Sequence, residues 1–181
     1  MKRIVLIFGL ISGAIAAALM WIMLAAMNSG AIDLEHGSMA YVTGYASMII
    51  SLSLVFFGIK SYRDNNGGHI TFLKGLQVGI LIGLISAVCY ATSWEVYFRT
   101  GGSNFMQEYS QKYVEHMKQN GATDDQIVKA QTEMAQMTEL YKNFFFRFAI
   151  TLSEILPVAI IVTLISAALL RRREILSAEP A

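Results

Sequence analysis

Four long apolar runs dominate this chain of 181 residues and limit what it can fold into. They cover about residues 4–27, 39–59, 70–98 and 144–170. An α-helix needs about 20 apolar residues to cross the hydrocarbon core of a bilayer, and each run reaches that length. Charged residues make up only 15% of the chain, against about 25% in a soluble domain. The sequence therefore predicts an all-α, polytopic membrane protein with four transmembrane helices in a single integral domain, residues 1–181.

The first run resembles a signal peptide because Lys2 and Arg3 precede it. The apolar region of a signal peptide is about 7–15 residues long, whereas residues 4–27 contain no charge at all. We expect a retained transmembrane helix here.

The distribution of cations predicts the orientation. If both termini are cytoplasmic, that side receives Lys2, Arg3, Lys60, Arg63 and the three arginines 171–173. The loop around Asp33, Glu35 and His36, which has no Lys or Arg, then lies outside. Cytoplasmic loops carry the excess of Lys and Arg, so both termini are predicted to be cytoplasmic. Trp21, Trp94 and Tyr97 lie near the outer ends of their spans, where aromatic rings prefer the membrane interface.

Small residues recur at four-residue spacing in two spans. Gly75, Gly79 and Gly83 lie along the third, and Gly9 and Gly13 along the first. Small residues let helix backbones approach closely inside a membrane. Both faces are predicted to be helix contacts, against each other or against other helices, within one chain or between two copies.

Residues 103–142 form the longest connection and predict a helical hairpin. Phe105, Tyr109, Tyr113 and Met117 make an apolar stripe at helical spacing. Gly121 offers a left-handed helix end, and Thr123 with Gln126 has the spacing of a capping box. A second apolar stripe follows at coiled-coil spacing: Ile127, Ala130, Met134, Met137, Tyr141 and Phe144.

These patterns predict two antiparallel helices whose stripes face each other. The second helix is expected to continue into the fourth span as one helix over residues 123–171. Alternatives for the stripes are an interfacial membrane helix, a contact between two copies, or docking of another protein.

Ionisable residues within the spans are the candidate polar sites, because charge in lipid needs a partner or water. Lys74 lies near the inner end of the third span, where it can snorkel to the interface or bind an anionic lipid headgroup. Glu95 and Arg147 lie at equal depth near the outer ends of two spans, and an interhelical ion pair is expected.

Glu154 lies deeper, about ten residues or about 15 Å along the helix from the outer boundary. At that depth the carboxyl group is protonated, hydrogen-bonded or open to water. Ser47, Ser51, Cys89 and Tyr90 lie at similar depth as donors, and Pro157 follows, which can kink the helix. Both a structural and a ligand- or ion-binding role are open.

Recognisable enzyme signatures are missing from the sequence. The turn at residues 64–68 lacks a phosphate-binding loop pattern, and there is no His-Glu-x-x-His motif. Cys89 is the only cysteine, and His116 has no partner ligand at metal-binding spacing. We expect no catalytic residue, cofactor, metal or nucleic-acid partner.

Several segments together resemble the bacterial membrane proteins grouped as domain of unknown function family 4199. They are Lys60 to Arg63, residues 67–72 with Lys74 and Gly75, residues 94–97, residues 154–157, and the arginines at 171–173. The resemblance covers the whole chain. It implies an inner-membrane location, and it implies no established activity or site residue.

Two kinds of function fit the sequence. The first is a structural or interaction protein, which contacts a second copy or another protein through a periplasmic hairpin at residues 103–142. The second is a small oligomeric transporter or ion-coupled protein that uses Glu154.

Overall fold

The computed structural model describes residues 1–29 and 37–171. In this part the chain forms seven helices and no strand: α1 (Lys2–Asn28), α2 (Gly37–Leu52), α3 (Leu54–Asp64), α4 (Phe72–Thr100), α5 (Phe105–Gln119), α6 (Asp124–Tyr141) and α7 (Phe144–Leu170). The acidic loop around Asp33 and the arginines 172 and 173 lie outside the described residues.

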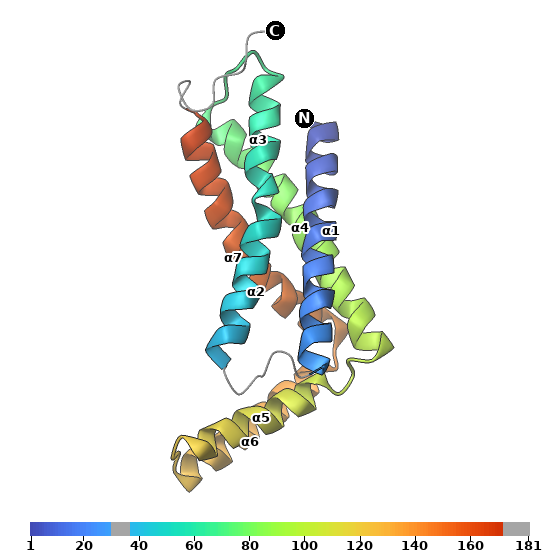
Figure 1. Cartoon of the computed structure of the whole chain (residues 1–181), viewed down its shortest axis with the longest axis vertical. Coiled ribbons are helices and arrows are strands. Elements are labelled where there is room, and N and C mark those ends of the chain that lie inside the picture. The colour runs from blue at the N-terminus through green and yellow to red at the C-terminus, as the bar shows by residue number, and fades with distance from the viewer. Residues whose placement is uncertain (30–36, 172–181) are drawn as a thin grey trace.

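Four helical stretches are long and apolar enough to cross a membrane: Lys2–Met27, Val42–Asp64, Phe72–Thr100 and Phe144–Leu170. The predicted all-α class with four potential spans is confirmed. Within the bundle, α4 packs against both α1 and α7, and α3 contacts all three of these helices. The starts of α1 and α4 and the ends of α3 and α7 lie at one end of the bundle, and α5 and α6 extend side by side beyond the other end (Figure 1).

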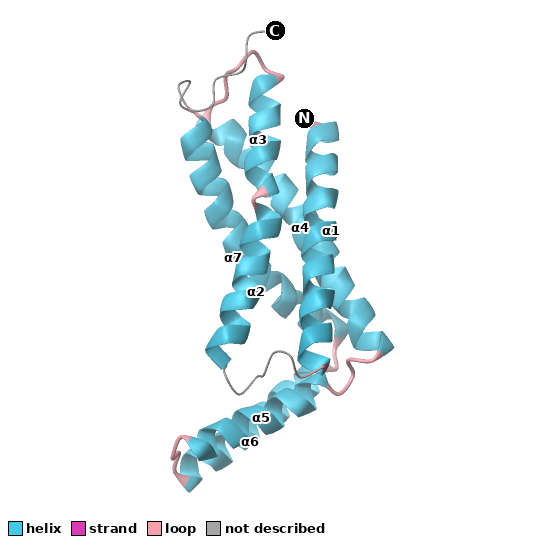
Figure 2. Cartoon of the chain, in the orientation of Figure 1, coloured by secondary structure: helices cyan, strands magenta, loops and turns pink. Residues whose placement is uncertain are grey.

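The sequence predicts one continuous helix for the second span, but the structure has two. The span divides at Ser53 into α2 and α3, and Figure 2 shows the interruption as a short loop segment. The Ser53 hydroxyl donates to the Ile50 carbonyl oxygen at 2.7 Å, and the Ser51 hydroxyl donates to the Met48 carbonyl oxygen at 2.9 Å. Serine hydroxyls that bind carbonyls of the preceding turn compete with the helical ladder and bend the helix. Two such bonds lie within three residues at this break.

The expectation of one helix over residues 123–171 is wrong. Helix α6 ends at Tyr141, and α7 starts at Phe144 with Asn143 as its N-terminal cap. The Asn143 side-chain oxygen accepts hydrogen bonds from the backbone N–H groups of Phe145 (2.9 Å) and Phe146 (3.3 Å). The N–H groups of a first helical turn have no acceptor within the helix. The Asn143 side chain supplies one, and a new helix starts after it. The coiled-coil spacing crosses this point because it reports apolar period and not backbone continuity.

Local end signals in the sequence are confirmed. Thr123 and Gln126 form both halves of the capping box: the Thr123 N–H donates to Gln126 Oε1 at 3.0 Å, and the Gln126 N–H donates to Thr123 Oγ1 at 3.4 Å. Gly121 has a φ of 76°, which L side chains rarely adopt. The chain reverses direction there, between α5 and α6 (Figure 1).

The fully buried residues of α5 lie one position beyond the predicted aromatic stripe, whose members are half-buried except for Tyr113. Its buried residues are Met106 and Val114, while Tyr113 is 42% exposed. Phe105, Tyr109 and Tyr113 instead stack along the side of the helix, with ring centroids 6.3 and 6.4 Å apart and rings nearly parallel. We call these three residues the aromatic ladder. Phe105 and Tyr109 are half-buried, and the Phe105 ring packs against the buried cluster around Trp94.

Candidate functional site

The Glu95–Arg147 ion pair expected from equal depth is present. Arg147 Nε donates to Glu95 Oε1 at 2.6 Å, and Nη2 donates to Oε2 at 2.7 Å. The residues are 4% and 6% exposed, respectively. This two-point geometry is the strong form of an arginine–carboxylate contact. It joins the C-terminal part of α4 to the first turn of α7.

Arg147 has further partners. Its Nη1 donates to the Tyr141 carbonyl oxygen at 2.7 Å, and its Cζ lies 3.8 Å from the centroid of the Phe98 ring. This carbonyl belongs to the last residue of α6. The last carbonyl groups of a helix accept no hydrogen bond within that helix, so this one is free for Arg147. Arg147 therefore binds α4, α6 and α7 together, and its charge is satisfied on several sides. This arrangement positions helices, and it leaves little of either charged group free for a ligand.

The aromatic residues expected at the membrane interface form a cluster with one another. Trp94 meets Phe105 edge-to-face at 4.9 Å, and Trp21 meets Tyr97 edge-to-face at 5.7 Å. Trp21 Nε1 donates to the Ser93 hydroxyl at 2.9 Å. Sequence analysis treated these rings as separate anchors. The structure places them where α1, α4 and α5 meet, so they also fix the start of α5.

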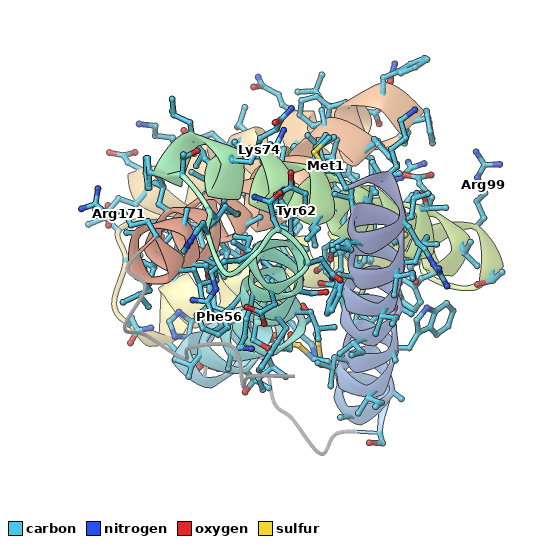
Figure 3. The ribbon with its side chains drawn as sticks, turned by 90° about the horizontal axis from the view of Figure 1, so that it is seen from above. Met1, Phe56, Tyr62, Lys74, Arg99 and Arg171 are labelled. Atoms are coloured by element: carbon cyan, nitrogen blue, oxygen red, sulfur yellow. The ribbon has the colours of Figure 1, made fainter. Side chains whose placement is uncertain are left out.

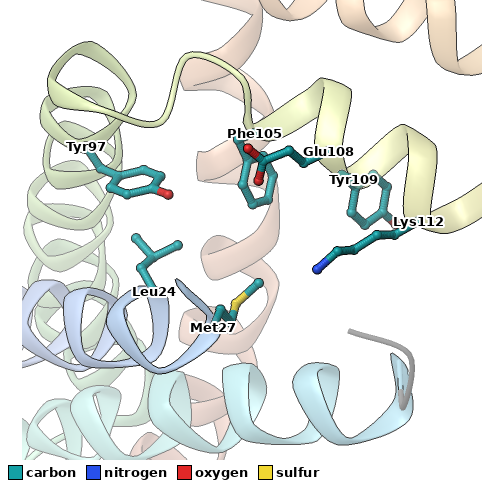
Figure 4. Close-up of a pocket in the computed structure, with 7 residues that line it drawn as sticks. All are labelled: Leu24, Met27, Tyr97, Phe105, Glu108, Tyr109 and Lys112. Carbon is teal, nitrogen blue, oxygen red and sulfur yellow. The ribbon is translucent and has the colours of Figure 1, made fainter. Parts of the chain in front are cut away.

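Beside this cluster lies a cavity of about 220 Å³, which sequence analysis missed. Its lining residues come from α1, α4 and α5: Leu24, Met27, Tyr97, Phe105, Glu108, Tyr109 and Lys112. Figure 4 shows the Tyr97 hydroxyl and the Lys112 ammonium group directed into it. Glu108 and Lys112 have the four-residue spacing of one helix face, which is the signal that could have paired them.

Glu154 is exposed on α7 and is separate from the Glu95–Arg147 pair. Its charge acts on Tyr141: burial first, and the Glu154 carboxylate second, raise the pKa of the Tyr141 phenol. Within residues 1–29 and 37–171, no hydrogen bond to the Glu154 side chain is found. Two of the four expected donors act elsewhere: Ser47 donates to the Gly44 carbonyl oxygen and Ser51 to that of Met48.

Lys74 lies at the opposite end of α4 from Glu95, in the first turn of the helix. Its Nζ donates to Gln77 Oε1 at 2.8 Å. Of the four candidate polar residues, the structure thus brings together only Glu95 and Arg147. In the described part of the chain, no three His, Cys, Asp or Glu side chains converge as metal ligands.

The glycines of α4 and α1 contact different helices. A Cβ added to Gly75, Gly79 or Gly83 would lie 3.1, 2.5 or 3.0 Å from side-chain atoms of Ala167, Thr163 and Ala159 on α7. A Cβ added to Gly9 would lie 2.8 Å from Ile85 Cβ on α4, and one added to Gly13 would lie 2.5 Å from Cys89 Cβ on the same helix. The two glycine faces therefore do not meet each other. Each is occupied by a neighbouring helix of the same chain.

Arg63 is a buried cation that sequence analysis treated only as an orientation signal. It is 1% exposed, and its Nε donates to Asp64 Oδ1 at 3.1 Å. Lys60 Nζ donates to the other oxygen of the same carboxylate at 2.7 Å. The four-residue spacing of Lys60 and Asp64 could have indicated their pairing, but nothing local in the sequence indicates burial of Arg63.

The helices and their contacts define a helical protein with four potential membrane spans. The family described as protein of unknown function (DUF4199) matches residues 7–172, which is nearly the whole chain, and the chain belongs to this family. No curated protein and no solved structure was found to match it.

Proposed function

We propose that this chain is a non-enzymatic structural or interaction protein of the bacterial inner membrane. In this proposal all four spans cross the bilayer, both termini are cytoplasmic, and the α5–α6 pair is a periplasmic hairpin. The hairpin contacts another protein or a second copy of the chain. The cation distribution along the sequence supports the orientation, and the lack of a catalytic motif supports a non-enzymatic role.

The aromatic ladder is the observation that carries this proposal. Phe105 and Tyr109 are half-buried beside the Met106–Val114 edge of α5, and Tyr113 remains 42% exposed at the far end. Aromatic side chains, Tyr in particular, are enriched in protein interfaces, where they supply much contact area at low entropic cost. Three stacked rings on an extended helical pair suit a contact surface better than a solvated face.

The base of the hairpin is firmly held, which supports a presenting role. Tyr141 and Met106 pack with Met20, Leu24 and Trp94 in one apolar cluster. The Arg147 guanidinium group also donates a hydrogen bond to the last carbonyl oxygen of α6. The proposed surface is therefore presented on a fixed base, which lowers the ordering cost of binding.

Replacing Tyr113 by alanine tests this function, with Tyr45→Ala on α2 as the matched control. Both are tyrosines of similar exposure, 42% and 50%, but Tyr45 lies within a potential span. Each variant is extracted from membranes in a mild detergent, and the mass of the complex is measured by native mass spectrometry. We expect Tyr113→Ala to reduce the complex mass to that of the monomer while Tyr45→Ala leaves it unchanged.

The mass of the lost component distinguishes a second copy from a different protein. A wild-type chain that is monomeric in native membranes by in situ crosslinking as well as in detergent would overturn the interaction role. Equal loss in both variants would show a general effect of extraction and would also contradict it.

A small oligomeric transporter or ion-coupled protein is the alternative, and the position of Glu154 favours it. A carboxyl group exposed on α7 at mid-span is costly against lipid, and such residues usually face water or a partner. Its test is ion or proton flux in proteoliposomes, with Glu154→Gln against Glu139→Gln, an exposed carboxylate on α6. Flux that Glu154→Gln alone abolishes would establish transport. No flux in the wild type would exclude this role for the ions tested.

A further inference from the structure

A second cavity lies at the end of the bundle opposite α5 and α6. Its volume is about 490 Å³, and it is lined by residues from α3, the α3–α4 turn, α4 and the end of α7: Tyr62, Asn66, His69, Ile70, Thr71, Lys74 and Arg171. In the view from above in Figure 3, Tyr62 and Lys74 lie over the middle of the bundle and Arg171 lies at its edge, at the end of α7. None of the residues that line it is an acid.

Two cations from different helices border this cavity. Lys74 belongs to the first turn of α4, and Arg171 directly follows α7. In the described ranges, neither forms an ion pair with a carboxylate; the only polar partner found for Lys74 Nζ is the neutral Gln77 amide. The nearby Asp64 is already held by Lys60 and Arg63. The positive charge of Lys74 and Arg171 is therefore available to a ligand.

Hydrogen-bond donors of the same cavity suit a phosphate group. The start of α4 lies at its edge, and first-turn N–H groups with the positive end of the helix dipole favour anions. Arg171 supplies a planar guanidinium group, which binds phosphate oxygens in pairs, and Lys74 supplies a point charge. The Thr71 hydroxyl accepts from the Lys74 N–H at 3.3 Å, so its own proton is free to donate.

We propose that this cavity binds an anionic phosphate group. Both cations lie at the boundaries of potential spans, at Phe72–Thr100 and Phe144–Leu170. A lipid headgroup reaches this depth, and basic pockets between transmembrane helices bind anionic lipid headgroups. The ligand class is therefore the phosphate of an anionic phospholipid, or a soluble phosphate that presents the same chemistry. The site is independent of the hairpin surface proposed above, and it lies at the other end of the molecule.

Native mass spectrometry of the full chain with defined lipids tests the site. The probes are phosphatidylglycerol, which is anionic, and phosphatidylcholine, which has no net charge. We expect the wild type to retain phosphatidylglycerol preferentially. Lys74→Gln and Arg171→Gln should each weaken this binding about fivefold, which corresponds to ~1 kcal/mol for each cation near a headgroup.

Two further variants make the result specific. Lys74→Arg keeps the charge and should retain most of the binding, which a folding defect would not allow. Lys129→Gln removes an exposed cation on α6 and should leave binding unchanged. Equal retention of both lipids by the wild type, or equal loss in Lys129→Gln and Lys74→Gln, would overturn the proposal.

Competition identifies the source of the phosphate. Inorganic phosphate is added at increasing concentration to the chain with bound phosphatidylglycerol. Displacement at millimolar concentration would assign the site to the phosphate group alone. Retention of the lipid would assign it to a lipid headgroup held also by its acyl chains.

Discussion

Arg147 and Glu95 are 52 residues apart in sequence and meet through two parallel hydrogen bonds in the interior of the protein. The pair fixes the C-terminal part of α4 against the start of α7, and the same guanidinium group binds the end of α6.

Breaking this pair should destabilise the protein strongly. Glu95→Leu or Arg147→Leu alone leaves one buried charge without its partner, which costs about 3–5 kcal/mol. The double variant removes both charges and should recover most of that loss. The free energy of unfolding is measured by denaturant titration in detergent micelles. A double variant as unstable as the sum of the two singles would show that the residues do not act as a pair.

Enlarging Gly79 should separate α4 from α7. A Cβ there would already lie 2.5 Å from Thr163 Cγ2, so Gly79→Leu should cost about 1–3 kcal/mol through overpacking. Gly44→Leu is the matched control, because the nearest atom to a Cβ at Gly44 is the Met23 methyl group at 3.9 Å. The same unfolding titration measures both. Equal destabilisation of the two variants would contradict a specific close contact at Gly79.

Removing the cap at Asn143 should fray the start of α7. Asn143→Ala leaves the N–H groups of Phe145 and Phe146 without their acceptor, at a cost of about 0.5–2 kcal/mol. Hydrogen exchange of these two amides should accelerate while exchange deeper in α7 is unchanged. Gln131→Ala, at an exposed site within α6, is the control and should stay within about 0.5 kcal/mol of the wild type. Unchanged exchange at Phe145 and Phe146 would mean that the cap is dispensable.

Neutralising Glu154 should have little effect on stability. Its side chain accepts no hydrogen bond within residues 1–29 and 37–171, so Glu154→Gln should change the free energy of unfolding by less than about 0.5 kcal/mol. The measurement is again detergent unfolding, with Glu95→Gln as a positive control for a bound carboxylate. A loss of stability as large as that of Glu95→Gln would show that Glu154 has a structural partner.

Features that depend on length and composition were predictable from the sequence. The four apolar stretches, the capping box at Thr123 and the turn at Gly121 each follow from a local rule, and each is present. The ion pair of Glu95 and Arg147 was also predictable, because charge at equal depth in lipid needs a partner.

Features that depend on the choice between competing hydrogen bonds were not predictable. Ser53 and Asn143 are ordinary polar residues in the sequence, yet their side chains bind backbone groups and end helices. The face that α5 buries was misplaced by one residue, because ring size predicts apolar area and not which edge the partner helix covers. The partners of the glycines are set by the order of helices around α4, which spacing within one helix does not encode.

The interruption at Asn143 changes how force passes between the two ends of the molecule. A continuous rod from residue 123 to 171 would act as a lever, and any push on the tip of α6 would tilt the membrane segment with it. With separate helices, α6 and α7 are linked by the two residues between them, by packing around Tyr141, and by the hydrogen bond from Arg147 to the Tyr141 carbonyl oxygen. The joint can therefore bend at residues 142 and 143 without breaking either helix, and the packing around Tyr141 and Arg147 limits how far it bends.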